Sequence, residues 1–217
     1  MSYEILRPFG PPIYKSTLSD SFMEFLKTVT EQTRTVAVNV GHNLAGNLES
    51  QFQAEMNNEQ KLQFMAEIRQ HVFSSLVEID TDINEIFKGP PEIDRLNFNM
   101  GGGPWINFQK PNEFNPFHSH SGLLSCVIYI DVPEAIADEN KFITISTNAP
   151  SAGKISFIWG HDGYGTNSMF AHQPVTGEIF MFPAQLKHLV YPYKSNVERI
   201  SMSFNVHNIE THTKIGV

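Results

Sequence analysis

Three histidines stand at positions from which imidazole nitrogens can converge. His118 and His120 are separated by one residue and come just before a long apolar segment, and His188 follows another apolar segment 70 residues after His118. Alternate residues of an extended chain point to the same face, so the first two side chains can reach one metal ion from a single strand end. Imidazole is a frequent ligand of divalent metals. An exposed polar loop would also tolerate the pair, so the metal prediction depends on His188 joining it.

Segment 199–204 predicts a polar wall on one side of a strand. Arg199, Ser201 and Ser203 alternate strictly with three apolar residues, Ile200, Met202 and Phe204. An arginine and two hydroxyls on one face are typical of a lined cavity, and a guanidinium offers paired donors that match a carboxylate. The alternative is a strand whose polar face is exposed to solvent.

The order and spacing of these residues resemble a known enzyme family. After the His-x-His pair come a distal histidine, an arginine eleven residues later, and a serine two residues further. This arrangement resembles the 2-oxoglutarate/Fe(II)-dependent oxygenases, and in particular a family found in bacteria and phages that is related to prolyl-hydroxylase-like enzymes. The resemblance covers roughly residues 95–208 and rests on five segments: Trp105-Ile106-Asn107, Asn115 with His118-Ser119-His120, Leu124-Ser125-Cys126-Val127-Ile128-Tyr129, Gly177…Phe182-Pro183…His188, and Arg199-Ile200-Ser201…Phe204-Asn205.

The resemblance implies a role for each matching residue. His118 and His188 would bind Fe(II), and Arg199 would pair with the distal carboxylate of 2-oxoglutarate. Ser201 would hydrogen-bond the same carboxylate, and Tyr129 would add a second hydroxyl. The implied catalytic residues are therefore His118, His188 and Arg199.

His120 departs from the pattern of most such enzymes, which have Asp or Glu at this position. A third imidazole would leave the iron complex one unit more positive than the usual two-histidine, one-carboxylate set. Either three histidines bind the metal or a carboxylate from elsewhere replaces His120. Glu113 and Asp131 are near in sequence but lack the matching spacing, so we favour His118, His120 and His188.

The remaining histidines have weaker claims. His161 lies between glycines and aromatic residues on a predicted loop, where it could reach the mouth of a cavity, and His172 lies on a predicted strand; neither has the spacing of a ligand. We expect the others to be surface or packing residues: His42, His71, His207 and His212.

The elements that must position these residues change in character near Gly89-Pro90-Pro91. Apolar periodicity predicts helices from about residue 18, with Ser16 or Ser19 as N-cap, and over 58–79. Short strands are then predicted at 96–100, 105–109, 123–131, 142–146, 155–158, 168–172, 178–182, 189–193 and 199–206. The sequence therefore predicts one α+β domain over 1–217, in which helices of 1–90 buttress a cupin-like jelly roll (double-stranded β-helix) at 91–208.

Composition limits the function classes. The 217 residues carry a formal net charge of −8 and no basic cluster, which disfavours nucleic acid as a partner. Cys126 is the only cysteine, so an intrachain disulfide is excluded. No apolar run is long enough for a membrane span. We expect a cytoplasmic protein, in the host cytoplasm if it is phage-encoded, and the apolar N-terminal helices offer a surface for a homodimer.

These observations predict an Fe(II)- and 2-oxoglutarate-dependent dioxygenase. It would use O₂ to hydroxylate a peptide, an amino acid or a small molecule, releasing succinate and CO₂. Two alternatives stay open: a cupin-like three-histidine metalloenzyme that does not use 2-oxoglutarate, and a jelly-roll binding protein without enzymatic activity. We expect residues 136–141 and 160–167 and the helical N-terminal part to select the substrate.

Overall fold

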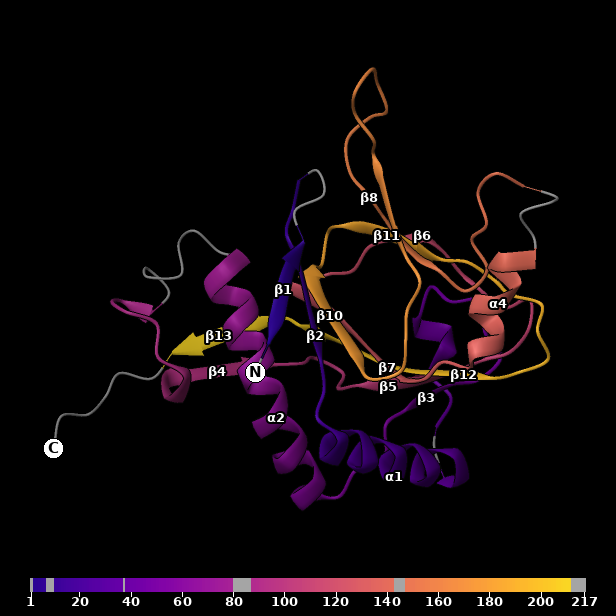
Figure 1. Ribbon diagram of the computed structural model, residues 1–217. Helices are drawn as coiled ribbons and strands as arrows, with labels where there is room; N and C mark the ends of the chain where they lie inside the picture. Colours follow the sequence, from indigo (N-terminus) through magenta and orange to yellow (C-terminus); the bar gives the residue numbers. More distant parts are fainter. Residues whose placement is uncertain (1, 7–9, 37, 80–86, 143–146, 212–217) are drawn as a thin grey trace, which may run out of the picture.

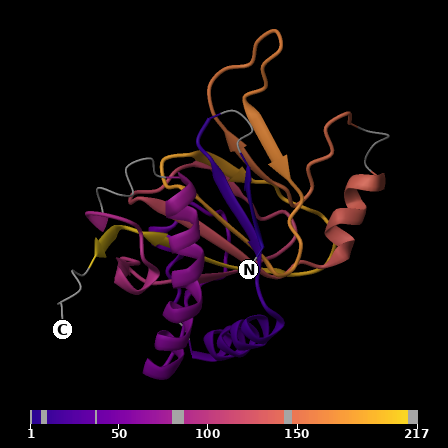
Figure 2. The same ribbon diagram turned by 60° about the vertical axis from the view of Figure 1, so that its left-hand side comes forward.

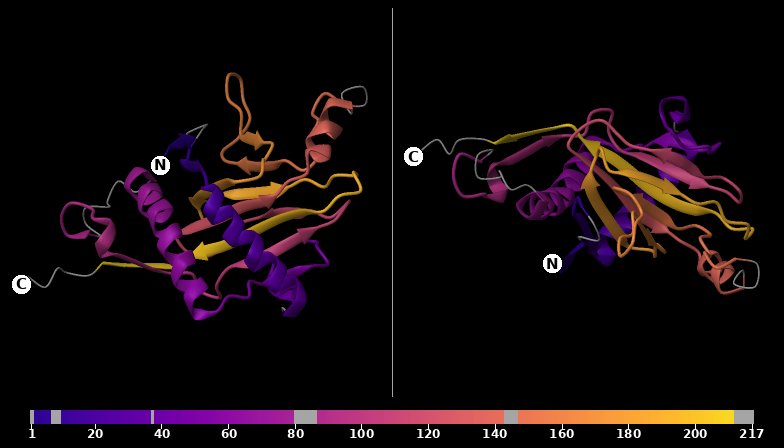
Figure 3. Two further views of the ribbon diagram at one scale, coloured as in Figure 1. Left: turned by 60° about the horizontal axis from the view of Figure 1, so that its bottom comes forward. Right: turned by 90° about the horizontal axis from the view of Figure 1, so that it is seen from above.

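Two β-sheets face each other, and two long helices cover the outer side of the larger sheet (Figure 1). The computed structural model describes residues 2–6, 10–36, 38–79, 87–142 and 147–211. Figures 2 and 3 show the same layers from other sides, with both helices lying against one face. Among the described residues, no helix has the length and apolarity that crossing a membrane requires.

The larger sheet has seven strands in the described part of the chain, in the order β1-β2-β10-β7-β12-β5-β3. Neighbouring strands in this sheet pair antiparallel. The strands are β1 (Tyr3–Leu6), β2 (Ile13–Thr17), β3 (Gln51–Gln53), β5 (Trp105–Gln109), β7 (Leu124–Asp131), β10 (Glu178–Pro183) and β12 (Arg199–Val206).

The smaller sheet has four described strands in the order β6-β11-β8-β9. They are β6 (Asn115–His118), β8 (Ile155–Ile158), β9 (Met169–His172) and β11 (Lys187–Val190). A separate antiparallel pair, β4 (Leu96–Asn99) with β13 (Asn208–Thr211), lies beside α2.

Strand alternation divides the apolar side chains between two cores. On β12, Met202 and Phe204 face the helices, whereas Arg199 and Ser201 face the smaller sheet. On β10, Phe180 and Phe182 likewise pack between the sheets. The predicted alternation of segment 199–204 is therefore confirmed, and it places the polar residues in the space between the two sheets.

The two long helices are α1 (Asp20–Val36) and α2 (Asn58–Ile79). The backbone N–H of Phe22 donates to Ser19 Oγ at 3.3 Å, so Ser19 caps α1 and Ser16 belongs to β2. Asn57 and Gln60 exchange two side chain–backbone hydrogen bonds of 2.9 Å, which is a capping box. The predicted range of α2 is confirmed. Short 3₁₀ turns lie at η1 (Gly41–Asn43) and η2 (Ile93–Arg95).

Several expectations about elements were wrong. The first ninety residues are not only helical, because β1, β2 and β3 extend the larger sheet. Residues 134–142 form helix α4 (Glu134–Phe142), so Phe142 does not begin a strand, and 143–146 lie outside the described residues. The strand expected at 189–193 begins earlier and is β11. The α+β class with facing antiparallel sheets is confirmed.

Candidate functional site

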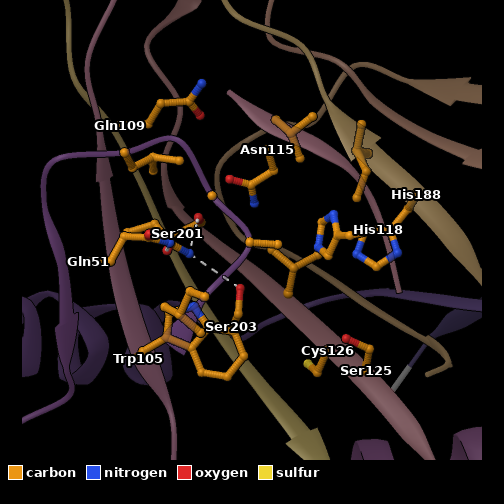
Figure 4. Close-up of a pocket in the computed structure, with 18 of the residues that line it drawn as sticks. Gln51, Trp105, Gln109, Asn115, His118, Ser125, Cys126, His188, Ser201 and Ser203 are labelled. Atoms are coloured by element: carbon orange, nitrogen blue, oxygen red, sulfur yellow. Dashed lines mark hydrogen bonds between the residues drawn. The ribbon is translucent and has the colours of Figure 1, made fainter. Parts of the chain in front are cut away.

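A pocket opens between the two sheets and holds about 640 Å³ of space, including solvent at its mouth. In the view of Figure 4, His118 and His188 lie on one side, and Gln51 and Ser201 lie on the opposite side. The predicted site residues His118, His120, His188, Arg199, Ser201 and Tyr129 all line this pocket. The fold therefore brings together segments that are up to 83 residues apart in the sequence.

The three histidines converge at one end of the pocket. His118 closes β6 and pairs directly with His188 on β11, and His120 follows in the turn after β6. Ring centroids are 4.3 Å apart for His118 and His188, 4.9 Å for His118 and His120, and 5.2 Å for His120 and His188. One ring nitrogen from each lies within 4.8 Å of the others, which is the arrangement that a shared metal ion requires.

Hydrogen bonds fix the tautomers of two of these rings. His118 Nδ1 lies 2.6 Å from the carbonyl oxygen of Pro116, and His188 Nδ1 lies 2.9 Å from that of Leu186. A carbonyl can only accept, so each Nδ1 carries the proton and each neutral ring keeps its lone pair on Nε2.

Burial keeps these rings uncharged. It lowers the pKa of His188 to about 3 and that of His120 to about 4, and it also lowers the pKa of His118. Repulsion between the neighbouring imidazoles lowers the pKa values of His188 and His120 further. At neutral pH the cluster is thus a set of lone-pair donors without charge.

Arg199 forms the opposite, buried end. Its guanidinium donates to the carbonyl oxygen of Gly153 at 2.6 Å and to Gln109 Oε1. Within the described residues, no carboxylate lies at ion-pair distance from it, and burial lowers the pKa of this guanidinium. Two of its five N–H groups are used by these acceptors, so the others are free to hold an anion.

Two hydroxyl-bearing residues stand beside this guanidinium. Tyr129 on β7 is paired with Ser201 on β12, so both face the pocket at the same level. The Tyr129 ring centroid is 5.8 Å from Arg199 Cζ, and Tyr129 Oη is buried without a hydrogen-bond partner in the described structure. Burial raises the pKa of Tyr129 above its ordinary value, so the phenol stays protonated and can donate.

Part of the pocket wall was not predicted from the sequence. Leu44, Ala45, Gly46 and Leu48 line the pocket together with Gln51, and all belong to a loop and a short strand of the N-terminal part. We call residues 41–50 the strap. Its neighbours Gln109 and Asn115 also line the pocket. Nothing local in the sequence marks the strap, because its position depends on β3 pairing with β5.

The segments expected to select the substrate lie elsewhere. Residues 136–141 belong to α4, and residues 160–167 form the tip of the β8–β9 hairpin; neither segment lines the pocket. Among the three named segments, only the N-terminal part reaches the pocket, and selection of the substrate by the other two stays a prediction. The N-terminal part reaches it through the strap and Gln51 rather than through its helices.

The other candidates are also engaged away from the pocket. His172 Nε2 lies 2.8 Å from a carboxylate oxygen of Glu178, and exposed His161 lies in the hairpin tip. Glu113 accepts the backbone N–H groups of Glu49 and Lys110. Asp131 ends β7 and is exposed, so neither of the carboxylates weighed against His120 reaches the histidines.

Comparison with known proteins agrees with this geometry. Residues 103–205 match the family described as "Putative 2OG-Fe(II) oxygenase". The matched segment contains all three histidines of the cluster and Arg199, but not the strap. No curated protein matches the sequence.

Solved structures support the fold. A Trichoplax adhaerens prolyl hydroxylase in complex with a hypoxia inducible factor peptide fragment is similar, with a TM-score of 0.54 and 10% identity over 94% of this chain and 83% of that one. AviO1 from Streptomyces viridochromogenes Tue57 has a TM-score of 0.53 and 11% identity over 90% and 89%. Residues 103–205 are thus similar to the 2OG-Fe(II) oxygenase family, whose enzymes use Fe(II) and 2-oxoglutarate, and the chain shares the double-stranded β-helix fold of the solved structures.

Proposed function

We propose that this protein is a 2-oxoglutarate-dependent hydroxylase whose iron is held by His118, His120 and His188 and whose 2-oxoglutarate is anchored by Arg199. A single observation carries the proposal: three neutral imidazoles and one buried guanidinium without a carboxylate partner line the same pocket. When bound, Fe(II) and 2-oxoglutarate supply the oxidising chemistry, with succinate and CO₂ as products.

The donor set fits Fe(II). Three imidazole nitrogens, from the paired strands β6 and β11 and from the segment after β6, would hold the ion, and Fe(II) held by so few protein ligands can also bind 2-oxoglutarate and O₂. The carbonyl oxygens of Pro116 and Leu186 accept from Nδ1 of His118 and His188, so Nε2 of each of these two rings keeps the lone pair that a metal ion needs. In the described structure, no carboxylate joins this cluster, which supports His120 as the third ligand.

The environment of Arg199 fits the distal carboxylate of 2-oxoglutarate. A permanent cation in a buried pocket is costly unless an anion accompanies it. Gly153 and Gln109 hold the guanidinium in place and leave donors free, and Tyr129 Oη is a further donor without a partner. Ser201 Oγ completes the anchor beside them. These residues bind and orient 2-oxoglutarate, while the apolar core around Phe182 limits the entry of water.

The substrate we propose is a peptide, an amino acid or a small molecule with a C–H bond that reaches the histidine end. The rival three-histidine enzyme that does not use 2-oxoglutarate has no need for a buried guanidinium in its pocket. A binding protein without activity has no need for three converging imidazoles with free lone pairs.

The test is to load the purified protein with Fe(II) without oxygen and then add 2-oxoglutarate. We expect the metal-to-ligand absorption of the chelate, followed by succinate formation when O₂ is admitted. Iron binding without the absorption band would favour the enzyme that does not use 2-oxoglutarate. Absence of iron binding would favour the non-enzymatic protein.

A further inference from the structure

Two amide oxygens in the pocket wall have no partner in the described protein. Gln51 Oε1 and Asn115 Oδ1 are both buried and accept no hydrogen bond. Gln51 as a whole is 1% exposed. A buried acceptor left unpaired costs about 1–3 kcal/mol, so such groups are rare and need an explanation.

The orientation of the Gln51 amide follows from its neighbours. Its Nε2 donates to Asn107 Oδ1 at 2.9 Å, and Asn107 Nδ2 lies 3.4 Å from both Ser201 Oγ and Ser203 Oγ. This chain of hydrogen bonds starts at the proposed 2-oxoglutarate anchor and ends at Gln51. It leaves Oε1 as the free end of the network, on the strap side of the pocket.

The strap lies directly over both amides. A Cβ added at Gly46 would be 2.6 Å from Asn115 Oδ1 and 2.8 Å from Gln51 Nε2, so only a residue without a side chain lets the strap come this close. The strap is fastened to the turn between β5 and β6. The Asn47 N–H donates to the carbonyl oxygen of Phe114 at 2.8 Å, and Glu49 pairs with Lys110 at 2.9 Å.

The charge of the pocket limits what can bind here. Arg199 is the one permanently charged side chain among the described lining residues, and the 2-oxoglutarate carboxylate would neutralise it. The rest of the wall near the strap is neutral, with amides, Ser203, Trp105 and two leucines. A free amino acid would bring an ammonium and a carboxylate into this space without partners, which is costly.

We propose that Gln51 and Asn115 recognise the substrate, and that they accept hydrogen bonds from an uncharged amide or hydroxyl group. The strap moves away from Gln51 Oε1 and Asn115 Oδ1 when the substrate enters, and it then forms the outer wall of the substrate site. This inference rests on the proposed function, because it assumes that 2-oxoglutarate occupies the Arg199 end. It favours a residue within a peptide chain, or a comparable neutral amide, over a free amino acid.

The experiment uses the full chain loaded with Fe(II) and 2-oxoglutarate. A panel of N-acetyl amino-acid amides is compared with the same amino acids in free form, and succinate release and the change in the chelate absorption are measured. We expect members of the blocked panel to stimulate succinate release and shift the absorption, and the free forms to leave both unchanged.

Gln51→Met and Asn115→Leu test the two residues. Each should weaken the response to the blocked amides about tenfold, the effect of one lost hydrogen bond, while the absorption band still forms. Gln53→Leu is the matched control, because this glutamine lies on the same strand, donates to the carbonyl oxygen of Pro104 and is not part of the pocket wall. It should respond like the unaltered protein.

Three outcomes would overturn the inference: free amino acids acting as strongly as blocked ones, no blocked amide acting at all, or both variants responding normally. Failure of the proposed function has a different signature, because the chelate absorption would then be missing before any probe is added.

Discussion

The two ends of the pocket are built on opposite principles. The histidine end lies on the smaller sheet and is neutral, and two of its three rings, His118 and His120, are partly exposed. The arginine end lies on the larger sheet and carries a permanent charge on Arg199, a residue that is only 4% exposed. The histidine end offers lone pairs that can bind a cation, whereas the arginine end offers N–H donors that can bind an anion. The pocket is thus suited to a metal and a carboxylate held apart.

The difference between the two ends also predicts what a substitution at each end would remove. Removing a histidine removes a ligand but leaves no unbalanced charge behind. Removing the arginine deletes the anchor of the anion and leaves the carbonyl oxygen of Gly153 and the amide of Gln109 without their donor. Substitutions at the two ends should therefore separate metal binding from 2-oxoglutarate binding.

The largest expected effect is at the histidine end. We expect His188→Ala to abolish stoichiometric Fe(II) binding, because this ring is the most buried of the three and pairs across strands with His118. Metal content after purification with Fe(II) is the measurement. His42→Ala, on the exposed 3₁₀ turn, is the control and should retain full metal. Full iron content in His188→Ala would refute the assignment.

The next effect is at the arginine end. Arg199→Met should weaken 2-oxoglutarate binding about a hundredfold, as loss of one partner of a buried charge pair does, and should leave metal content unchanged. Titration of the chelate absorption with 2-oxoglutarate measures it. Equal affinities in the variant and the unaltered protein would show that the anchor lies elsewhere.

Lowering the pH should protonate the buried imidazoles and should not change the charge of the Arg199 guanidinium, which stays protonated throughout. His71 is a reference outside the pocket: burial lowers its pKa to about 4, and it is hydrogen-bonded to Tyr14 Oη at 2.9 Å. Because its folded pKa is below the unfolded one of about 6.5, the unfolded state binds more protons between these values. The stability of the metal-free protein should therefore fall as the pH is lowered from 7 to 5.

The share of His71 in that fall is about 2 kcal/mol. Urea unfolding at several pH values, with a chelator present, measures it for the unaltered protein and for His71→Gln. The variant should be less stable at pH 7 but should lose less stability on acidification. The remaining slope comes from the other groups whose pKa values are lowered in the folded protein, the three pocket histidines among them. Identical slopes for both proteins would contradict this account.

The smallest effect is expected at Tyr129. Tyr129→Phe removes a hydroxyl that has no partner in the described structure, so the free energy of unfolding without 2-oxoglutarate should not fall. If the hydroxyl donates to the 2-oxoglutarate carboxylate, affinity should fall about tenfold, the effect of one hydrogen bond. Unfolding and 2-oxoglutarate titration on the same sample test both parts. An unchanged affinity would remove Tyr129 from the anchor.

Local pattern made much of the fold predictable. Helix α2 was predicted with its bounds because the apolar stripe depends only on residues three and four apart. The β12 alternation was predicted because strand periodicity is also local. The convergence of His118, His120 and His188 on one point came from the resemblance as much as from the residues, since nothing local relates a ligand to one 70 residues away.

By itself, then, the sequence determined the chemistry-bearing residues, the helix α2 and the facing of the strands that carry Arg199 and Ser201. The tertiary structure alone decided that β2 joins β10, that residues 134–142 form a helix, and that the strap and Gln51 close the pocket. The physical reason is the range of the interactions. A strand of three to five residues has too few contacts of its own, and its stability comes from hydrogen bonds to partners that the local sequence does not name.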